Sequence, residues 1–327
     1  MRKIVTLWLG LMVGLYAGPA GARLVCLAGI PPVAWLARGV GGDAVEVRVV
    51  VPPGRDPHSF TPTPRQVARF ARARAYFSLE MPFERRLSAR LRGLNPALEV
   101  IDVSRGIGRI PLSCGLEAGR MPPLYRSRDD IRGPRPRTWG KGAFSLRAQG
   151  RTTAPRRAPR GEPDPHLWLS PRLAARIAAN LARALERLDP EHASRYQARL
   201  ARLAGELEGL GRELGRVLAP CRGRVMLVQH AAFGYLARDY GLRQVALECG
   251  GKEPGPRRMA RLIELAKEQG VRVVFTEPGH PARGAQALAR AIGGRVVELD
   301  PLAGDYPAGL RRLARALARG LCGEAGR

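Results

Sequence analysis

Short apolar runs rich in β-branched residues alternate with helical patterns in two separate stretches of this 327-residue chain. The first stretch has predicted strands at Arg23–Gly29, Val45–Val51, Ala75–Leu79 and Leu98–Val103. The second has predicted strands at Arg224–Gln229, Arg243–Glu248, Val271–Glu277 and Arg295–Asp300. Strands that alternate with helices pair in parallel, so each stretch predicts an α/β domain whose parallel sheet is covered by helices.

Helical patterns fill the intervals. They are Val33–Val40, Pro64–Ala73, Ala231–Tyr240, Pro256–Gln269, Ala282–Ile292 and Pro307–Leu321. One further helix starts at Pro171, and Asp189-Pro190 starts another, with Asp189 as its cap and Pro190 in its first turn. In this last helix apolar residues recur at spacings of four and three from Tyr196 to Val217. The pattern predicts roughly thirty residues and a length of ~45 Å, enough for a rigid helix that joins the two domains.

The N-terminus has the layout of a secretory signal peptide. Two basic residues precede an apolar run from Ile4 to Tyr16, and the small residues Ala20-Gly21-Ala22 follow it. The run is shorter than the ~20 residues that a membrane anchor needs. We therefore predict export to the periplasm or another extracytoplasmic space. A lipid anchor on Cys26 is the alternative, which the large residues in front of this cysteine disfavour.

These boundaries predict a signal peptide at 1–22, an N-terminal α/β domain at 23–189, a linker helix at 190–219 and a C-terminal α/β domain at 220–327. Within the N-terminal domain, residues 104–162 are rich in Arg, Pro and Gly, and we expect a disordered basic loop there. A solvated insertion without a partner is the favoured interpretation of this loop. A docking segment for anionic lipid or for a transporter is the alternative.

The formal net charge of +27 raises the question of nucleic-acid binding. Nearly all of the positive residues are arginines spread over every segment, and no basic motif is interleaved with aromatic residues that could stack on bases. We therefore expect no nucleic-acid partner.

The cysteines are Cys26, Cys114, Cys221, Cys249 and Cys322. No CxxC spacing occurs among them, so the sequence does not support a zinc ribbon or a redox dithiol. One disulfide is compatible with the oxidising exterior, with Cys322 as its favoured member.

Three histidines stand at places where a binding crevice is expected. His58 follows the strand that ends at Val51, and His166 precedes the helix at Pro171. His230 stands at the end of the predicted strand Arg224–Gln229. Open α/β sheets bind ligands beyond the carboxyl ends of their strands, where Asp300 also lies. Three imidazoles and one carboxylate suit a four-coordinate zinc ion.

The neighbouring polar residues are predicted to have other roles. Asp56 and Asp164 each stand two residues before a histidine, and we expect them to orient the loops through hydrogen bonds. His192 and His280 are predicted to face solvent. Glu277 closes a strand and could serve as a general base if the site were catalytic.

Several segments together resemble a known family. They are Pro52–Phe60, Asp164–Pro171, His230–Tyr235, Tyr240–Leu242, Phe275–Pro278 and Leu299–Leu302. Their order and content resemble the zinc- and manganese-specific periplasmic solute-binding proteins of ABC transporters, known as the cluster A-I family. The resemblance covers nearly the whole chain after the signal peptide.

This resemblance implies two similar α/β domains joined by one long helix, with the metal held at their interface. It implies ligand roles for His58 and His166 from the first domain and for His230 and Asp300 from the second. The expected function is the capture of zinc and its delivery to an ABC transporter permease by a monomeric binding protein. Manganese is the alternative cargo, although a third imidazole favours zinc.

Two features depart from the family pattern. The basic loop contains no histidine, so a metal-scavenging role does not transfer to it. Some relatives also pair a C-terminal cysteine with one in the strand before Glu-Pro. Here that strand, Val271–Phe275, contains no cysteine, so Cys322 lacks that partner.

A zinc hydrolase is the remaining alternative. It is disfavoured because Asp300 would fill the position of the reactive water and no HExxH motif is present, so we expect no enzyme.

Overall fold

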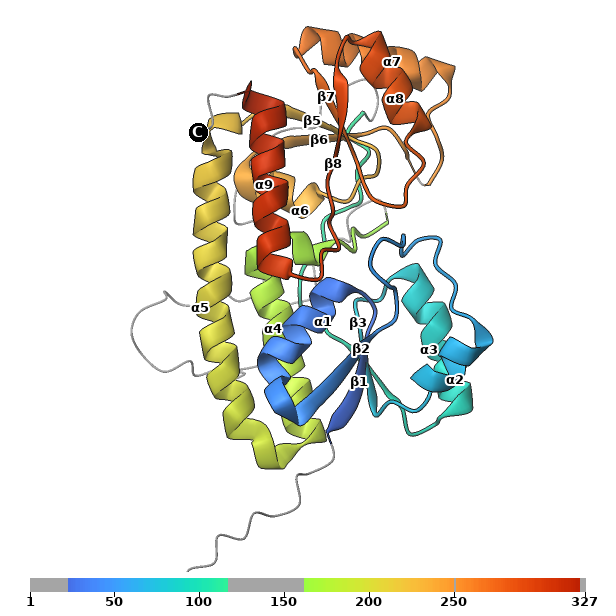
Figure 1. The fold of residues 1–327 in the computed structure, drawn as a ribbon, viewed down its shortest axis with the longest axis vertical. Helices are drawn as coiled ribbons and strands as arrows, with labels where there is room; N and C mark the ends of the chain where they lie inside the picture. The colour runs from blue at the N-terminus through green and yellow to red at the C-terminus, as the bar shows by residue number, and fades with distance from the viewer. Residues whose placement is uncertain (1–22, 117–161, 250, 324–327) are drawn as a thin grey trace, which may run out of the picture.

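The computed structural model describes residues 23–116, 162–249 and 251–323. It shows two α/β domains stacked end to end, each with a four-stranded parallel sheet, as predicted (Figure 1). The predicted signal peptide, residues 1–22, and most of the predicted basic loop, residues 117–161, lie outside the described residues. Of the helices that are described, none has the length and apolar character needed to cross a membrane.

The N-terminal sheet has the strand order β2-β1-β3-β4. Its strands are β1 (Leu24–Ala28), β2 (Val45–Val49), β3 (Ala75–Ser78) and β4 (Glu99–Asp102). The connecting helices are α1 (Pro31–Gly41), α2 (Pro64–Phe70) and α3 (Pro82–Leu94). Every strand lies inside a predicted run, because short apolar runs that are buried on both faces are typical of parallel sheets.

Helix α3 was missed by the sequence analysis. Its first residue, Pro82, suits the first turn of a helix, and Glu84 accepts a hydrogen bond from the backbone N–H of Met81. Phe83, Leu87 and Leu91 are buried at spacings of four. The periodicity was therefore present in the sequence, among arginines on the exposed face.

The C-terminal sheet repeats the arrangement, with strand order β6-β5-β7-β8. Its strands are β5 (Val225–Val228), β6 (Arg243–Ala246), β7 (Val273–Thr276) and β8 (Arg295–Glu298), and its helices are α6 (Gly234–Tyr240), α7 (Pro256–Glu268), α8 (Arg283–Ala291) and α9 (Tyr306–Cys322). Strand β5 shows the two-residue period. Val225 and Leu227 belong to a separate outer core, whereas Met226 and Val228 belong to the large core shared with the rest of the protein.

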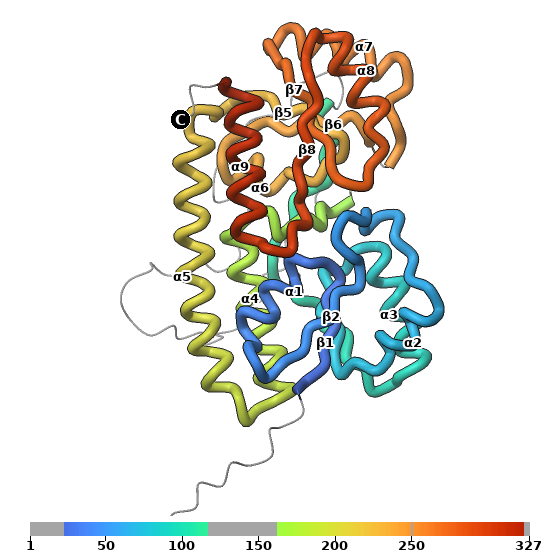
Figure 2. The backbone as a smooth tube through the Cα atoms, in the orientation of Figure 1, coloured from blue at the N-terminus to red at the C-terminus, as the bar shows by residue number. Residues whose placement is uncertain are grey.

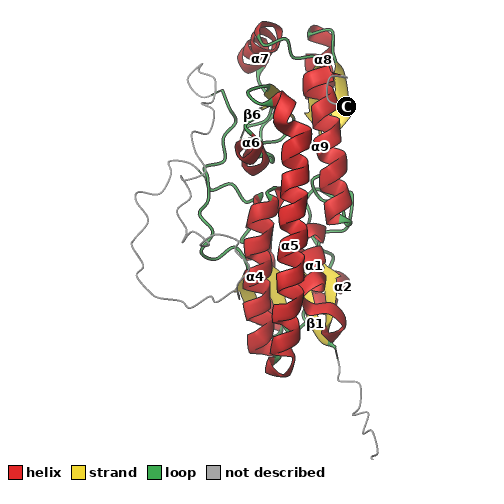
Figure 3. Cartoon of the chain, turned by 90° about the vertical axis from the view of Figure 1, so that its left-hand side faces the viewer, coloured by secondary structure: helices red, strands yellow, loops and turns green. Residues whose placement is uncertain are grey.

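Helices α4 (Pro171–Leu188) and α5 (Ala193–Leu218) connect the two sheets. Helix α5 packs against α4 and α1 in one half of the molecule and against α9 in the other (Figure 3). Its 26 residues extend about 39 Å. The predicted start at Pro190 is a 3-10 turn instead, and Asp189 uses its side chain to bind His192 Nδ1 and Tyr196 Oη rather than to cap the helix.

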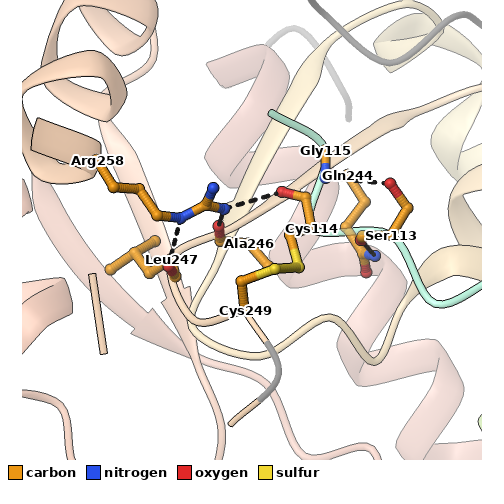
Figure 4. The surroundings of a disulfide bond; sticks show 8 residues. All are labelled: Ser113, Cys114, Gly115, Gln244, Ala246, Leu247, Cys249 and Arg258. Carbon is orange, nitrogen blue, oxygen red and sulfur yellow. Dashed lines mark hydrogen bonds between the residues drawn. A yellow bond between two sulfur atoms is a disulfide. The ribbon is translucent and has the colours of Figure 1, made fainter. Parts of the chain in front are cut away.

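The first part of the predicted disordered loop is an ordered connection between the domains. Residues 104–116 run from β4 to the C-terminal domain (Figure 2). The Ile110 N–H donates to Tyr235 Oη, and the Ala246 N–H donates to the Cys114 carbonyl. Arg258 donates to the carbonyls of Cys114, Ala246 and Leu247 (Figure 4). The prediction of disorder was wrong for residues 104–116. The groups that order this segment lie far away in the sequence, so no local pattern indicates them.

Two disulfides are present, whereas the sequence analysis considered one. Cys114 pairs with Cys249, and Cys221 pairs with Cys322, with Cα atoms 5.5 and 5.7 Å apart. Cys322 therefore has a partner, which stands at the end of the linker helix and not in the strand before Glu-Pro. Cys26 is free and completely buried in β1. A lipid chain on Cys26 is incompatible with this burial.

Candidate metal centre

The three predicted histidines lie together between the two domains. His58 belongs to the loop after β2, and His166 precedes the 3-10 turn Leu167–Leu169 that leads into α4. His230 stands two residues after the end of β5. Their ring centroids are 4.7 to 5.7 Å apart. Each ring offers one nitrogen, and all three nitrogens lie within 4.8 Å of one another. Loops that are distant in the sequence thus bring three imidazole nitrogens to one point.

The spacing of these donors suits a tetrahedral ion. His166 Nε2 and His230 Nε2 are 3.4 Å apart. Two nitrogens bound to zinc at ~2.0–2.1 Å in a tetrahedral shell are separated by about 3.3 Å. The pair could therefore bind one zinc ion with little rearrangement.

Asp164 orients the His166 ring. Its Oδ1 accepts hydrogen bonds from the backbone N–H and from Nδ1–H of His166, both at 2.8 Å, and both side chains are buried. With the proton on Nδ1, Nε2 carries a free lone pair for a metal. Asp56 acts similarly on the loop of His58, whose backbone N–H donates to Asp56 Oδ1 at 2.8 Å. Both aspartates thus form hydrogen bonds within their loops, as predicted.

The environment keeps two of the imidazoles uncharged. Burial, followed by the neighbouring His166, lowers the pKa of His230 well below its ordinary value, and the same causes lower the pKa of His58. Metal binding requires neutral imidazole. At neutral pH, His58 and His230 therefore have free lone pairs available for a cation.

The histidines line a small pocket with a cavity of about 20 Å³. That volume is close to what one water molecule needs, so it suits a single ion rather than an organic substrate. Met81, Trp168, Glu277, His280 and Asp300 also line it. Glu277 is buried, and desolvation, together with Asp56 and Glu248, raises its pKa well above the ordinary value. Glu277 Oε1 has no hydrogen-bond partner among the described residues.

Asp300 lies beside the histidines without joining their compact group. It lines the pocket, but its carboxylate is not among the donors that lie within 4.8 Å of one another in the described part of the chain. It is exposed, and its Oδ1 accepts a hydrogen bond from the Leu302 N–H at 2.8 Å. The structure therefore places Asp300 at the edge of the site.

The two remaining histidines differ from the prediction. His280 does not face solvent: its side chain is only 11% exposed, and its ring stacks on His230 at 5.6 Å. The available signal was its place three residues after Glu277, near the carboxyl end of a strand. His192 is half-buried, and its Nδ1 lies 2.9 Å from Asp189 Oδ2, away from the metal pocket.

Comparison with known proteins agrees with this architecture. The family model described as the periplasmic component A of the zinc-uptake complex matches residues 27–320. Zinc-binding protein AdcA of Streptococcus pyogenes serotype M3 is 24% identical over 278 residues, which are 84% of this chain and 49% of AdcA. The chain thus spans about half the length of the AdcA proteins that it matches.

Solved structures of ZnuA match over nearly the whole fold. A ZnuA crystal structure is 31% identical and has a TM-score of 0.74, covering 91% of this chain and 99% of that one. A ZnuA deletion mutant solved with zinc bound is also 31% identical, with a TM-score of 0.73 and coverage of 92% and 98%. The arrangement of two sheets and a connecting helix is therefore that of a solved zinc-binding protein.

Proposed function

The chain belongs to the periplasmic component A family of zinc-uptake complexes, and on that premise we propose that it captures zinc and delivers it to an ABC transporter permease. Members of this family are binding components of uptake systems and not enzymes. In this proposal the protein is an exported monomer that carries the metal as cargo. Its partner is the membrane permease, which receives the metal for import.

One observation carries the proposal, namely the convergence of His58, His166 and His230 on one point. Two of the rings come from the N-terminal domain and one from the C-terminal domain, so a bound ion would bridge the domains. Asp300 is the proposed fourth ligand, because it lines the same pocket from the C-terminal side. The four residues would then complete a tetrahedral shell.

Zinc is the proposed cargo because imidazole is a softer donor than carboxylate. A site with three imidazoles favours zinc, whereas manganese prefers oxygen donors. The local charge also suits a cation, since the acidic side chains of Asp56 and Asp300 line the pocket of a protein whose formal net charge is +27. Manganese is the alternative cargo for the same site.

We also propose that the domains close little around the metal. Helix α5 contacts helices of both domains, and the segment 104–116 is tied to the C-terminal domain by the Cys114–Cys249 disulfide. Trp168 Nε1 donates to the Pro301 carbonyl at 2.8 Å, and Tyr306 Oη donates to the Trp168 carbonyl at 2.5 Å. These connections flank the site on several sides and oppose a wide hinge motion.

A competitive metal titration of the mature protein tests the proposal, with zinc and manganese offered to the wild type and to His230→Ala. We expect one tightly bound zinc per chain, a higher melting temperature in zinc, and loss of both effects in the variant. His192→Ala is the matched control, since His192 lies outside the pocket. The function is refuted if the wild type binds no zinc, and the ligand assignment is refuted if His230→Ala binds it unchanged.

A further inference from the structure

We propose that His280 is an additional metal ligand, which competes with Asp300 for the fourth position and sets the preference of this site for zinc over manganese. The inference rests on the proposed function, because it needs a metal at His58, His166 and His230. It refines that proposal in one respect: with zinc bound, His280 takes the fourth position in place of Asp300. His280 lies outside the sequence segments that carry the family resemblance. Four lines of structural evidence support it.

The first is its position. His280 lies in the turn after β7, and its ring is nearly parallel to that of His230, with an interplanar angle of 19° and a centroid distance of 5.6 Å. It lines the same pocket as the three close histidines. No other histidine in the described part of the chain adjoins this group, because His192 is paired with Asp189 elsewhere.

The second is the turn that holds the ring. The His280 N–H donates to the Glu277 carbonyl at 3.2 Å, and Gly279 adopts a φ of 82°. A Cβ at Gly279 would lie 3.1 Å from the carbonyl oxygen of Gly54, in the loop that carries His58. Glycine therefore allows a close approach of this turn to the N-terminal domain, which brings His280 into the pocket.

The third is the state of its two ring nitrogens. Nε2 lies 3.8 Å from Asp56 Oδ1, the same atom that accepts the His58 N–H. A carboxylate next to one nitrogen favours the proton there and leaves a lone pair on the other. Nδ1 is buried and has no hydrogen-bond partner among the described residues. A buried nitrogen without a partner is costly, and a metal bond would satisfy it.

The fourth is the demand for a fourth donor. Three imidazoles leave one position of a tetrahedral shell open, and two side chains of different chemistry border it. The imidazole of His280 suits zinc, and the carboxylate of Asp300 suits manganese. His280 stands outside the compact group of three, so binding requires its side chain to rotate toward the ion. The site would then be a four-imidazole shell with zinc and a three-imidazole, one-carboxylate shell with manganese.

The test compares His280→Ala, His280→Gln and Asp300→Asn with the wild type by competitive titration against zinc and manganese, with His192→Ala as control. We expect both His280 variants to lose roughly tenfold or more in zinc affinity while manganese affinity changes by less than about threefold. Asp300→Asn should show the reverse selectivity. X-ray absorption at the zinc edge should count four imidazoles in the wild type and three in His280→Ala.

The outcomes separate this inference from the proposed function. Zinc binding that is lost in His230→Ala but unchanged in both His280 variants would uphold the function and overturn the role of His280. Equal losses of zinc and manganese affinity in both His280 variants would also overturn it, since selectivity would not depend on this residue. A wild type without bound zinc would refute the function itself. Melting curves of the metal-free variants identify any that fail to fold, and the two His280 substitutions provide independent readings.

Discussion

Asp164 accepts two hydrogen bonds from His166 with a single oxygen, one from the backbone N–H and one from the ring, each 2.8 Å long. The two side chains are 1% and 3% exposed, so water does not compete for these bonds. The ring is thereby held in one orientation and one tautomer before any metal arrives. Preorganisation of this kind is what a tight metal site requires.

We expect Asp164→Ala to weaken zinc binding roughly 10- to 100-fold, the usual effect of removing the partner of a metal-bound histidine. The substitution leaves His166 in place but frees its ring to rotate and to change tautomer. Competitive titration with a chelating dye measures the loss. Asp189→Ala is the matched control, because it removes a similar aspartate–histidine pair at His192. Equal zinc affinities for the wild type and Asp164→Ala would contradict the orienting role.

Gly234→Ala should disturb the same contact from the other side. A Cβ on Gly234 would lie 2.7 Å from Asp164 Oδ2, so the carboxylate has to move. We expect a folded protein whose zinc affinity falls several-fold because His166 loses its fixed position. Gly205→Ala on α5 is the control, since its Cβ would meet no atom within 4 Å. That control should keep its zinc affinity and gain about 0.5–1 kcal/mol of stability.

Glu84 should make the stability of the protein depend on pH. Burial raises the pKa of Glu84 to about 7, against the opposing hydrogen bonds from the N–H groups of Met81 and Leu79. Because the folded-state pKa lies above the unfolded value, the contribution of Glu84 is fully present below pH 4.5 and is lost as the pH rises through 7. The loss amounts to about 3 kcal/mol at most.

Glu84→Gln keeps an oxygen for the two N–H donors and cannot ionise, so its free energy of unfolding should lack this decline. Denaturant unfolding of the metal-free protein from pH 4.5 to 8 measures the difference between the two curves. Glu206→Gln, on the exposed face of α5, should follow the wild type. Parallel curves for the wild type and Glu84→Gln would show that Glu84 does not titrate in this range.

The disulfide between Cys114 and Cys249 should stabilise the connection between the domains. It joins residues 135 positions apart, and we expect the double variant Cys114→Ser/Cys249→Ser to lose roughly 2–4 kcal/mol in its free energy of unfolding. Denaturant unfolding with and without a reductant measures this loss. Thiol titration of the denatured, unreduced protein should find Cys26 alone in the wild type and no more than Cys26 in the double variant. Additional reactive thiols in the wild type would contradict the pairing.

The sequence was sufficient for the strands and for the choice of three histidines because both depend on local patterns. Each strand lies in a short apolar run. The leucines of α5 recur at helical spacing, because they form the face that packs against the neighbouring helices. His58 and His230 each follow a strand, and open α/β sheets bind ligands beyond the carboxyl ends of their strands, so a shared site could be expected. Asp56 and Asp164 act within two residues of a histidine, so their roles were also local.

What only the tertiary structure decided involves contacts between segments far apart in the chain. The partner of Cys322 is Cys221, and residues 104–116 are ordered by the opposite domain, neither of which has a local signal. His280 is largely shielded from solvent, where a glycine turn of one domain meets the loop of the other at Gly54. Local patterns specify which side chains reach the end of a strand. The packing of the two domains determines which of them face the same pocket.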